Sequence, residues 1–265
     1  MDSTIGRGYK YELIGSIPFT ITYKGNEIDI AELFYDFPPV TWFHDNSKMY
    51  NNIFFLFKGK INLFDTSKIL PLEWTGTDIR KESQKLEKRT DSIQFHIIEK
   101  LKSNADYKII FDDDDANEAS DIIAIKFWDG GDSRIKIDLY HCKFSSKSQS
   151  GGRLKDLYEV CGQAQRSFHW RHTTYELLQH MVRRQNSRIN QGKASRYEIG
   201  GDEEMSTLLN MITSGYCELE FNIYVVQPGI SKKVIEKETE HLKLLGATDL
   251  LLKKTGNNFF VMTSE

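Results

Sequence analysis

The chain has 265 residues, 39% of them hydrophobic, which is enough for one large folded domain or a large domain with a smaller companion. Its 35 basic and 38 acidic residues give a formal charge of -3, which excludes a protein that is basic throughout, so contact with a polyanion must depend on a local patch. The three cysteines, Cys142, Cys161 and Cys217, are odd in number and match no zinc pattern, which favours a reducing compartment over a disulfide framework.

The N-terminal segment, MDSTIGRGYKYELIG, has no basic stretch followed by an apolar core, and no segment approaches the roughly 18 apolar residues of a membrane span. We therefore expect a cytoplasmic protein. From residue 9 to about 72, short apolar or alternating runs are separated by Gly, Pro, Asn and Asp, a pattern typical of β-strands joined by turns. This pattern predicts a smaller β-rich region over residues 1–80.

Residues 81–265 have the pattern of an α/β domain. Hydrophobic spacing predicts a helix over about 82–103, then strands at 107–111, 121–128 and 134–144, with DGGD as a hairpin turn between the last two. The period then changes, and we expect helices within 154–168, 173–188 and 202–215, a strand at 218–229, a helix within 231–256 and a strand at 258–264. This order predicts a mixed central sheet flanked by helices.

The strand predicted at 134–144 ends in polar residues. A period of two places His141 and Lys143 on the face that begins as aliphatic core, and Asp138 and Cys142 on the other face. Asp121 starts the preceding strand, and in an antiparallel hairpin that position lies beside the end of the next strand. A carboxylate, a second metal-capable side chain and a lysine at one edge are what metal-dependent phosphodiester hydrolysis requires. A plainer interpretation is a strand end that emerges into solvent, with Lys143 extending to water.

These residues resemble a motif of the PD-(D/E)XK, or restriction-endonuclease-like, superfamily, particularly its Mrr-type branch, in which an Asp opens one strand and an (E/Q)-x-Lys triplet ends the next. Asp121 of SDIIAI matches the Asp, His141 the E/Q position, and Lys143 of YHCK the lysine. The segment IQFHIIEKL resembles the family's first helix, which implies Glu99 as a further acidic ligand. Gln163 of VCGQAQR lies in the helix after the lysine strand. The resemblance covers about residues 90–170.

The resemblance implies a restriction-endonuclease-like core and a metal-dependent hydrolase that cuts DNA in restriction or antiphage defence, with Mg²⁺ or Mn²⁺ as cofactor. It also implies a helicase or other ATPase as partner, and a homo-oligomer is compatible with it. In these roles Asp121 binds the metal, His141 completes its ligand shell and Lys143 positions the nucleophile. His141 departs from the family pattern, because imidazole suits Mn²⁺ or a transition metal better than Mg²⁺. The alternative is a nuclease-fold module without activity that binds nucleic acid or assembles with an ATPase.

Between Arg166 and Arg196 seven basic residues accompany a single acid, Glu176, with aromatic residues interleaved. Such a local excess predicts a surface for a phosphate backbone, and the alternative is a solvated helix face. The residues expected to bind nucleic acid are Arg166, Arg171, Arg183, Arg184 and Arg188. The run DDDD at 112–115 is interpreted as a solvated turn, and Glu118 is kept as an additional candidate ligand.

Overall fold

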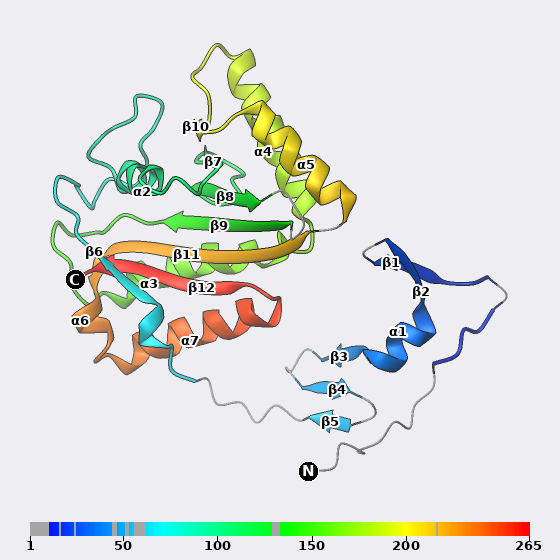
Figure 1. Ribbon diagram of the computed structural model, residues 1–265. Coiled ribbons are helices and arrows are strands. Elements are labelled where there is room, and N and C mark those ends of the chain that lie inside the picture. Colours follow the sequence, from blue (N-terminus) through cyan, green and yellow to red (C-terminus); the bar gives the residue numbers. More distant parts are fainter. Residues whose placement is uncertain are drawn as a thin grey trace. The chain divides into compact units, whose positions relative to one another are not determined.

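The computed structural model describes residues 11–15, 17–23, 25–43, 47–50, 53–55, 62–128, 133–215 and 217–265. The chain divides into two compact units, Met1–Lys60 and Ile61–Glu265 (Figure 1). This division precedes the predicted boundary near residue 80, because strand β6 (Ile69–Leu72) pairs with the last strand, β12 (Asn258–Ser264), in the larger unit. No helix in the described ranges is both long and apolar enough to cross a membrane.

The N-terminal unit is small and rich in β-structure, as the sequence predicts. Its strands form one two-stranded and one three-stranded antiparallel sheet: β1 (Thr20–Tyr23) with β2 (Asn26–Asp29), and β3 (Val40–Trp42), β4 (Lys48–Tyr50) and β5 (Ile53–Phe55). A short helix that the sequence pattern did not predict, α1 (Ile30–Asp36), begins where the Asp29 carboxylate accepts hydrogen bonds from the first turn. Large apolar side chains of this unit, such as Trp42 and Phe54, are about half exposed.

A seven-stranded mixed sheet organises the larger unit, in the order β10-β7-β8-β9-β11-β12-β6. Its remaining strands are β7 (Ile109–Asp112), β8 (Ile122–Trp128), β9 (Arg134–Cys142), β10 (Tyr197–Ile199) and β11 (Glu218–Ser231). The pairs β7–β8 and β8–β9 are antiparallel, whereas β9, β11, β12 and β6 run parallel to one another. The predicted mixed α/β sheet is therefore confirmed, while the predicted turn at 129–132 lies outside the described residues.

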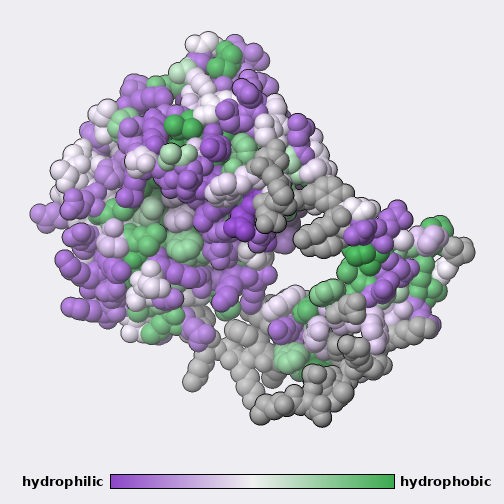
Figure 2. Space-filling model, in the orientation of Figure 1, coloured by the Kyte–Doolittle hydropathy of each residue, from purple (hydrophilic) through white to green (hydrophobic). Residues whose placement is uncertain are grey.

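Helices cover both faces of this sheet (Figure 1). They are α2 (Ile93–Lys102), α3 (Leu154–Arg166), α4 (Thr174–Asn190), α5 (Asp202–Ser214), α6 (Lys232–Ile235) and α7 (Thr239–Lys254), with short 3-10 turns η1 (Thr66–Lys68) and η2 (Ser167–His169). Alternation along β9 explains the two layers: Ile137 and Leu139 join the core formed with α3, α4, α5 and α7, whereas Tyr140 and Cys142 pack with α2. Hydrophilic residues cover most of the visible face of this unit (Figure 2).

The helix predicted over 82–103 is shorter than expected, because α2 begins only at Ile93. In the preceding segment Lys85 and Lys88 have φ angles of 54° and 52°, which an α-helix excludes. The buried Gln84 donates its backbone N–H to the side chain of Gln94 instead of to a helical carbonyl. The segment before α2 is therefore an irregular loop, and it carries residues of the candidate site.

Candidate functional site

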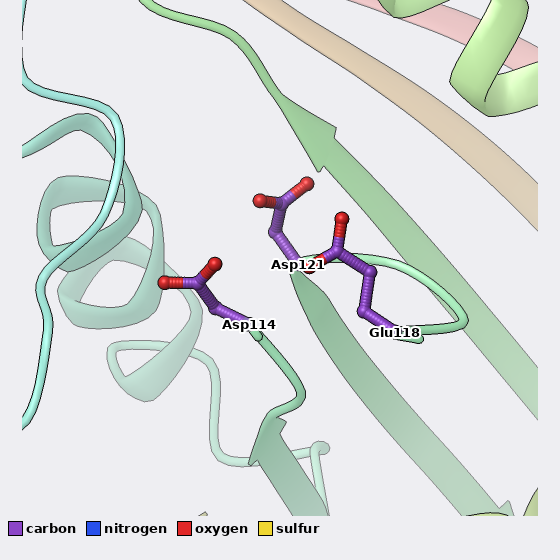
Figure 3. A group of neighbouring side chains, drawn as sticks. All are labelled: Asp114, Glu118 and Asp121. Atoms are coloured by element: carbon purple, nitrogen blue, oxygen red, sulfur yellow. The ribbon is translucent and has the colours of Figure 1, made fainter. Parts of the chain in front are cut away.

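The connection between β7 and β8 gathers three carboxylates. Asp114 follows β7, Asp121 precedes β8, and Glu118 lies on the loop between them (Figure 3). One ligand oxygen from each of the three lies within 4.8 Å of the other two. Hard divalent cations prefer carboxylate oxygens, so this donor set fits Mg²⁺ or Mn²⁺. We refer to Asp114, Glu118 and Asp121 as the acidic triad.

Hydrogen bonds within the connection hold the acidic triad together. The backbone N–H of Asp113 donates to the carbonyl of Asp121 at 3.0 Å, and the N–H of Ala119 donates to the Asp113 carboxylate at 2.8 Å. The hydroxyl of Ser83, from the loop before α2, donates to the carboxylate of Asp114. The loop is thus closed at its base and tied to a second segment of the chain.

Helix α4 supplies the partners of the carboxylates at the start of this connection. Nε2 of His180 lies 3.0 Å from the buried Asp113 carboxylate, and the guanidinium of Arg184 pairs with the same group. Nη1 of Arg188 lies 3.4 Å from the carboxylate of Asp112. Burying an ion pair requires close partners of opposite charge, and here they come from one face of a single helix.

The interpretation of DDDD at 112–115 as a solvated turn is wrong for Asp112 and Asp113, which are buried. Arg196 adds to their enclosure, because its Nη1 donates to the carbonyl of Asp112 at 2.8 Å. The cations that enclose the run lie about 70 to 85 positions away in the sequence. No local sequence pattern therefore predicts that the run is buried.

The same contacts divide the predicted nucleic-acid surface. Arg184 and Arg188 have side chains that are only 14% and 10% exposed and are engaged with the acidic run. Arg171 is half-buried, and its Nη1 donates to the carbonyl of Leu219 at 2.8 Å. Arg166 and Arg183 are exposed. Of the five predicted residues, these last two have the exposure expected of a surface contact.

Asp121 lies at the end of β9, as the hairpin argument predicts. The β8–β9 register pairs Ile122 with Tyr140, and the backbone N–H of Cys142 donates to Oδ2 of Asp121 at 2.9 Å. Asp121 is 3% exposed. Burial raises the pKa of Asp121 well above its usual value, and the neighbouring Glu118 carboxylate raises it further. A cation held between these groups would stabilise their ionised forms.

Glu118 and Glu82 share this electrostatic environment. Burial raises the pKa of Glu118, and the nearby Asp114 and Asp113 carboxylates add to the rise. Burial also raises the pKa of Glu82, against the opposing hydrogen bond that its Oε2 accepts from the N–H of Phe144 at 2.9 Å. A group of mutually repelling, partly buried carboxylates is therefore concentrated at this end of the sheet.

Lys143 lies beside this acidic group as a charged amine. Its Nζ is 2.8 Å from the Glu159 carboxylate of α3 and 3.4 Å from Oε2 of Glu82. Burial opposes the charge, but these two carboxylates outweigh it and raise the pKa of Lys143. The charge of Asp114 also raises the pKa of Glu82, so Glu82 interacts electrostatically with both Lys143 and a member of the acidic triad.

His141 is buried and is hydrogen-bonded to Ser167, and it is not a member of the acidic triad. Ser167 donates its hydroxyl hydrogen to the carbonyl of Ala119 at 3.0 Å, so at 2.8 Å Nε2 of His141 must donate to the Ser167 oxygen. Nδ1 is then left as an acceptor. Burial lowers the pKa of His141 to about 3, and the charge of Arg166 contributes, so the imidazole is neutral.

The predicted ligand set therefore differs from the geometry in two members. Glu99 is exposed, pairs with Lys102 at 2.8 Å and lines a separate pocket beside His96 on α2. Neither Glu99 nor His141 belongs to the acidic group found among the described side chains. The carboxylates that lie beside Asp121 are instead those of Asp114 and Glu118.

Two pockets adjoin the acidic triad. One, of about 380 Å³, shares Asp114 and lies against α4. The other, of about 110 Å³, shares Glu118 and is lined by His141, Gln163 and Arg166, among others. Within the described chain, Oε1 of Gln163 is buried without a hydrogen-bond partner. Asp114 and Glu118 thus each line one of these pockets, whereas the buried Asp121 lines neither of the two.

Sequence reasoning missed the role of Asp114 and the presence of Glu82. The DDDD run was the available signal for Asp114, but consecutive acids seldom converge on one ion, and only the closed loop makes the convergence evident. Glu82 carries no sequence signal, because its segment was predicted to be helical.

Comparison with protein-family models, with curated proteins and with solved structures found no match.

Proposed function

We propose that the chain is a metal-dependent nuclease that hydrolyses phosphodiester bonds in DNA. The observation that carries this proposal is the convergence of the acidic triad with Lys143 at the ends of β8 and β9. The resemblance of Asp121 and Lys143 to the PD-(D/E)XK motif supports the same function, as does the order of α2, three strands and α3.

Each residue has a definite task in this proposal. Asp114, Glu118 and Asp121 would hold the cation, which would polarise the phosphate and lower the pKa of a bound water. Lys143 orients the attacking water and stabilises the charge that develops on the phosphate. Glu82 and Glu159 position the Lys143 amine. His141 supports the loop through Ser167 and Ala119 rather than ligating the metal.

The test compares the wild type with Asp121→Asn and Lys143→Gln on plasmid DNA, linear DNA and RNA, each with Mg²⁺ and with Mn²⁺. We expect both variants to lose at least about a hundredfold in cleavage rate, because each removes a group that acts on the reacting phosphate. Calorimetric titration with Mn²⁺ should show binding to the wild type and to Lys143→Gln, and none to Asp121→Asn.

Glu99→Gln is the matched control, since it removes a carboxylate that the motif implied but that lies outside the acidic triad. It should cut DNA and bind Mn²⁺ like the wild type. Unchanged cleavage by Asp121→Asn would exclude the assigned site. A wild type that binds DNA but cuts nothing with either metal would instead favour the module without activity, working with a separate helicase or ATPase.

A further inference from the structure

The pocket of about 380 Å³ beside Asp114 is lined mainly by charged side chains. It is formed by the loop before α2, the acidic run after β7, and α4 with the segment that follows it. Its cationic lining consists of Lys85, Arg184, Arg188, Lys193 and Arg196. Three carboxylates also line it, including Asp114, so cations outnumber acids at its wall.

The arginines and the lysines of this pocket differ in their partners. Arg184, Arg188 and Arg196 are engaged with the acidic run. Among the described residues, the amines of Lys85 and Lys193 have no carboxylate partner, and Nζ of Lys193 donates only to the side chain of Gln191, at 2.6 Å. Both lysines are exposed. Asp114 also has no ion-pair partner in the described part of the chain, so two lysine charges and one carboxylate remain, and their balance is positive.

The buried guanidinium of Arg196 supports an anion as the ligand of the pocket. Arg196 is 6% exposed, and its Nε is buried without a hydrogen-bond partner in the described structure. Burial, together with the charges of Arg184 and Arg188, lowers the pKa of Arg196, so a negative ligand would relieve this repulsion.

We propose that this pocket binds a phosphate group of the DNA strand next to the bond that is cut, with Lys85 and Lys193 as its principal contacts. The inference rests on the proposed nuclease function and adds a second phosphate site to it. Asp114 belongs to the acidic triad and also lines the pocket, so a strand that crosses the triad would bring a neighbouring phosphate to the lysines. The flexible lysine amines can follow such a phosphate as compact charges. The planar guanidinium groups of the arginines restrict the direction from which the phosphate enters the pocket.

The experiment measures binding of the full chain to a fluorescein-labelled single-stranded DNA oligonucleotide by anisotropy, with a chelator present so that no strand is cut. Lys85→Gln/Lys193→Gln should bind about tenfold more weakly than the wild type. The slope of log K against log salt should fall by about 0.7, because the pocket neutralises one phosphate and each neutralised phosphate on a single strand contributes about 0.7.

The matched control is Lys237→Gln/Lys253→Gln, which removes the same charge from exposed positions after α6 and on α7, away from α4 (Figure 1). It should leave the affinity and the salt slope close to those of the wild type. The proposal is overturned if the pocket variant binds like the wild type, or if the control loses as much affinity as the pocket variant.

The phosphate can belong to a strand end or to the interior of a strand, and three oligonucleotides distinguish the sources: one with a 5′-phosphate, one with a 5′-hydroxyl and one circular. Lysine-dependent binding of the circle assigns an interior phosphodiester, and dependence confined to the phosphorylated end assigns a terminal phosphate. Cleavage assays of the wild type with Mg²⁺ and with Mn²⁺ separate the two proposals. Lysine-dependent DNA binding by a wild type that cuts nothing with either metal keeps the phosphate pocket and rejects the nuclease.

Discussion

The neutral imidazole of His141 links the candidate site to the stability of the fold. Its pKa is lowered to about 3 by burial, whereas a histidine in an unfolded chain titrates near 6.5. As the pH falls below about 6.5, the unfolded chain therefore binds a proton that the folded chain does not, and the fold loses stability. At neutral pH this cost is absent.

We expect His141→Gln to remove this dependence. Between about pH 6.5 and pH 3 the wild type should lose up to about 1.4 kcal/mol of stability per pH unit through His141, and the variant should lose that much less. Urea unfolding at a series of pH values measures the difference between the two proteins, in which the carboxylate contributions largely cancel. Parallel profiles for wild type and variant would show that His141 is not the group responsible.

Some site residues follow from sequence and others do not, for a physical reason. Asp121 and Lys143 are predictable because strand alternation and hairpin pairing are local properties. The position of Glu118 depends on a loop that is closed by a hydrogen bond to the Asp113 carboxylate. That buried carboxylate is paired with Arg184, which lies on a helix far away in the sequence. Glu82 depends on a segment whose irregular path is set by side-chain hydrogen bonds. These are tertiary effects, and no window of sequence contains them.

At the scale of elements, α4 serves as a clamp on the connection between β7 and β8. His180 and Arg184, one helical turn apart, hold the Asp113 carboxylate, and Nη2 of Arg184 also donates to the carbonyl of Asp113 at 2.6 Å. The connection carries the whole acidic triad. The stability of a helix that contributes no ligand should therefore control the affinity for metal.

Arg184→Met should destabilise the protein by about 3 kcal/mol, because it leaves the buried Asp113 charge with fewer partners. Asp113→Asn/Arg184→Met should recover part of this loss, since both charges are then absent. Urea unfolding of the two single variants and the double variant measures the coupling.

The neighbouring Arg183 provides the control for this cycle, because it lies on the same helix but is exposed. Arg183→Met should change the free energy of unfolding by no more than about 0.5 kcal/mol. Equal losses for Arg183→Met and Arg184→Met would rule out the clamp.

The elements that sequence patterns predicted well are those long enough to repeat their apolar positions several times. The nine residues of β9 and the thirteen of α3 repeat their apolar positions often enough to be recognised. The strands β6 and β10 have four and three residues, and each exists because a longer strand elsewhere offers an edge. Short edge strands of this kind carry almost no periodic signal.

At the scale of the molecule, the two units differ in how much apolar surface they bury. Every buried hydrophobic residue in the described chain belongs to the larger unit, beginning with Phe64. In the N-terminal unit, hydrophobic residues lie at the surface (Figure 2). Burial of apolar area is the main favourable contribution to folding, so the larger unit has its own source of stability.

We therefore expect a fragment of residues 61–265 to fold by itself and to unfold cooperatively, with a melting temperature within a few degrees of that of the full chain. Circular dichroism during heating measures this, and Mn²⁺ titration checks that the acidic triad is intact. A fragment without a cooperative transition would mean that the N-terminal unit contributes to the core.

The parallel pairing of β6 with β12 also has a consequence for how the chain is made. β6 lies at the end of the sheet order, and its neighbour there is the last strand of the chain (Figure 1). During synthesis from the N-terminus, β6 leaves the ribosome almost two hundred residues before its partner. Its backbone donors and acceptors must stay hydrated or be covered by other proteins during that interval. The first strand of the larger unit to be made is thus among the last to join its sheet.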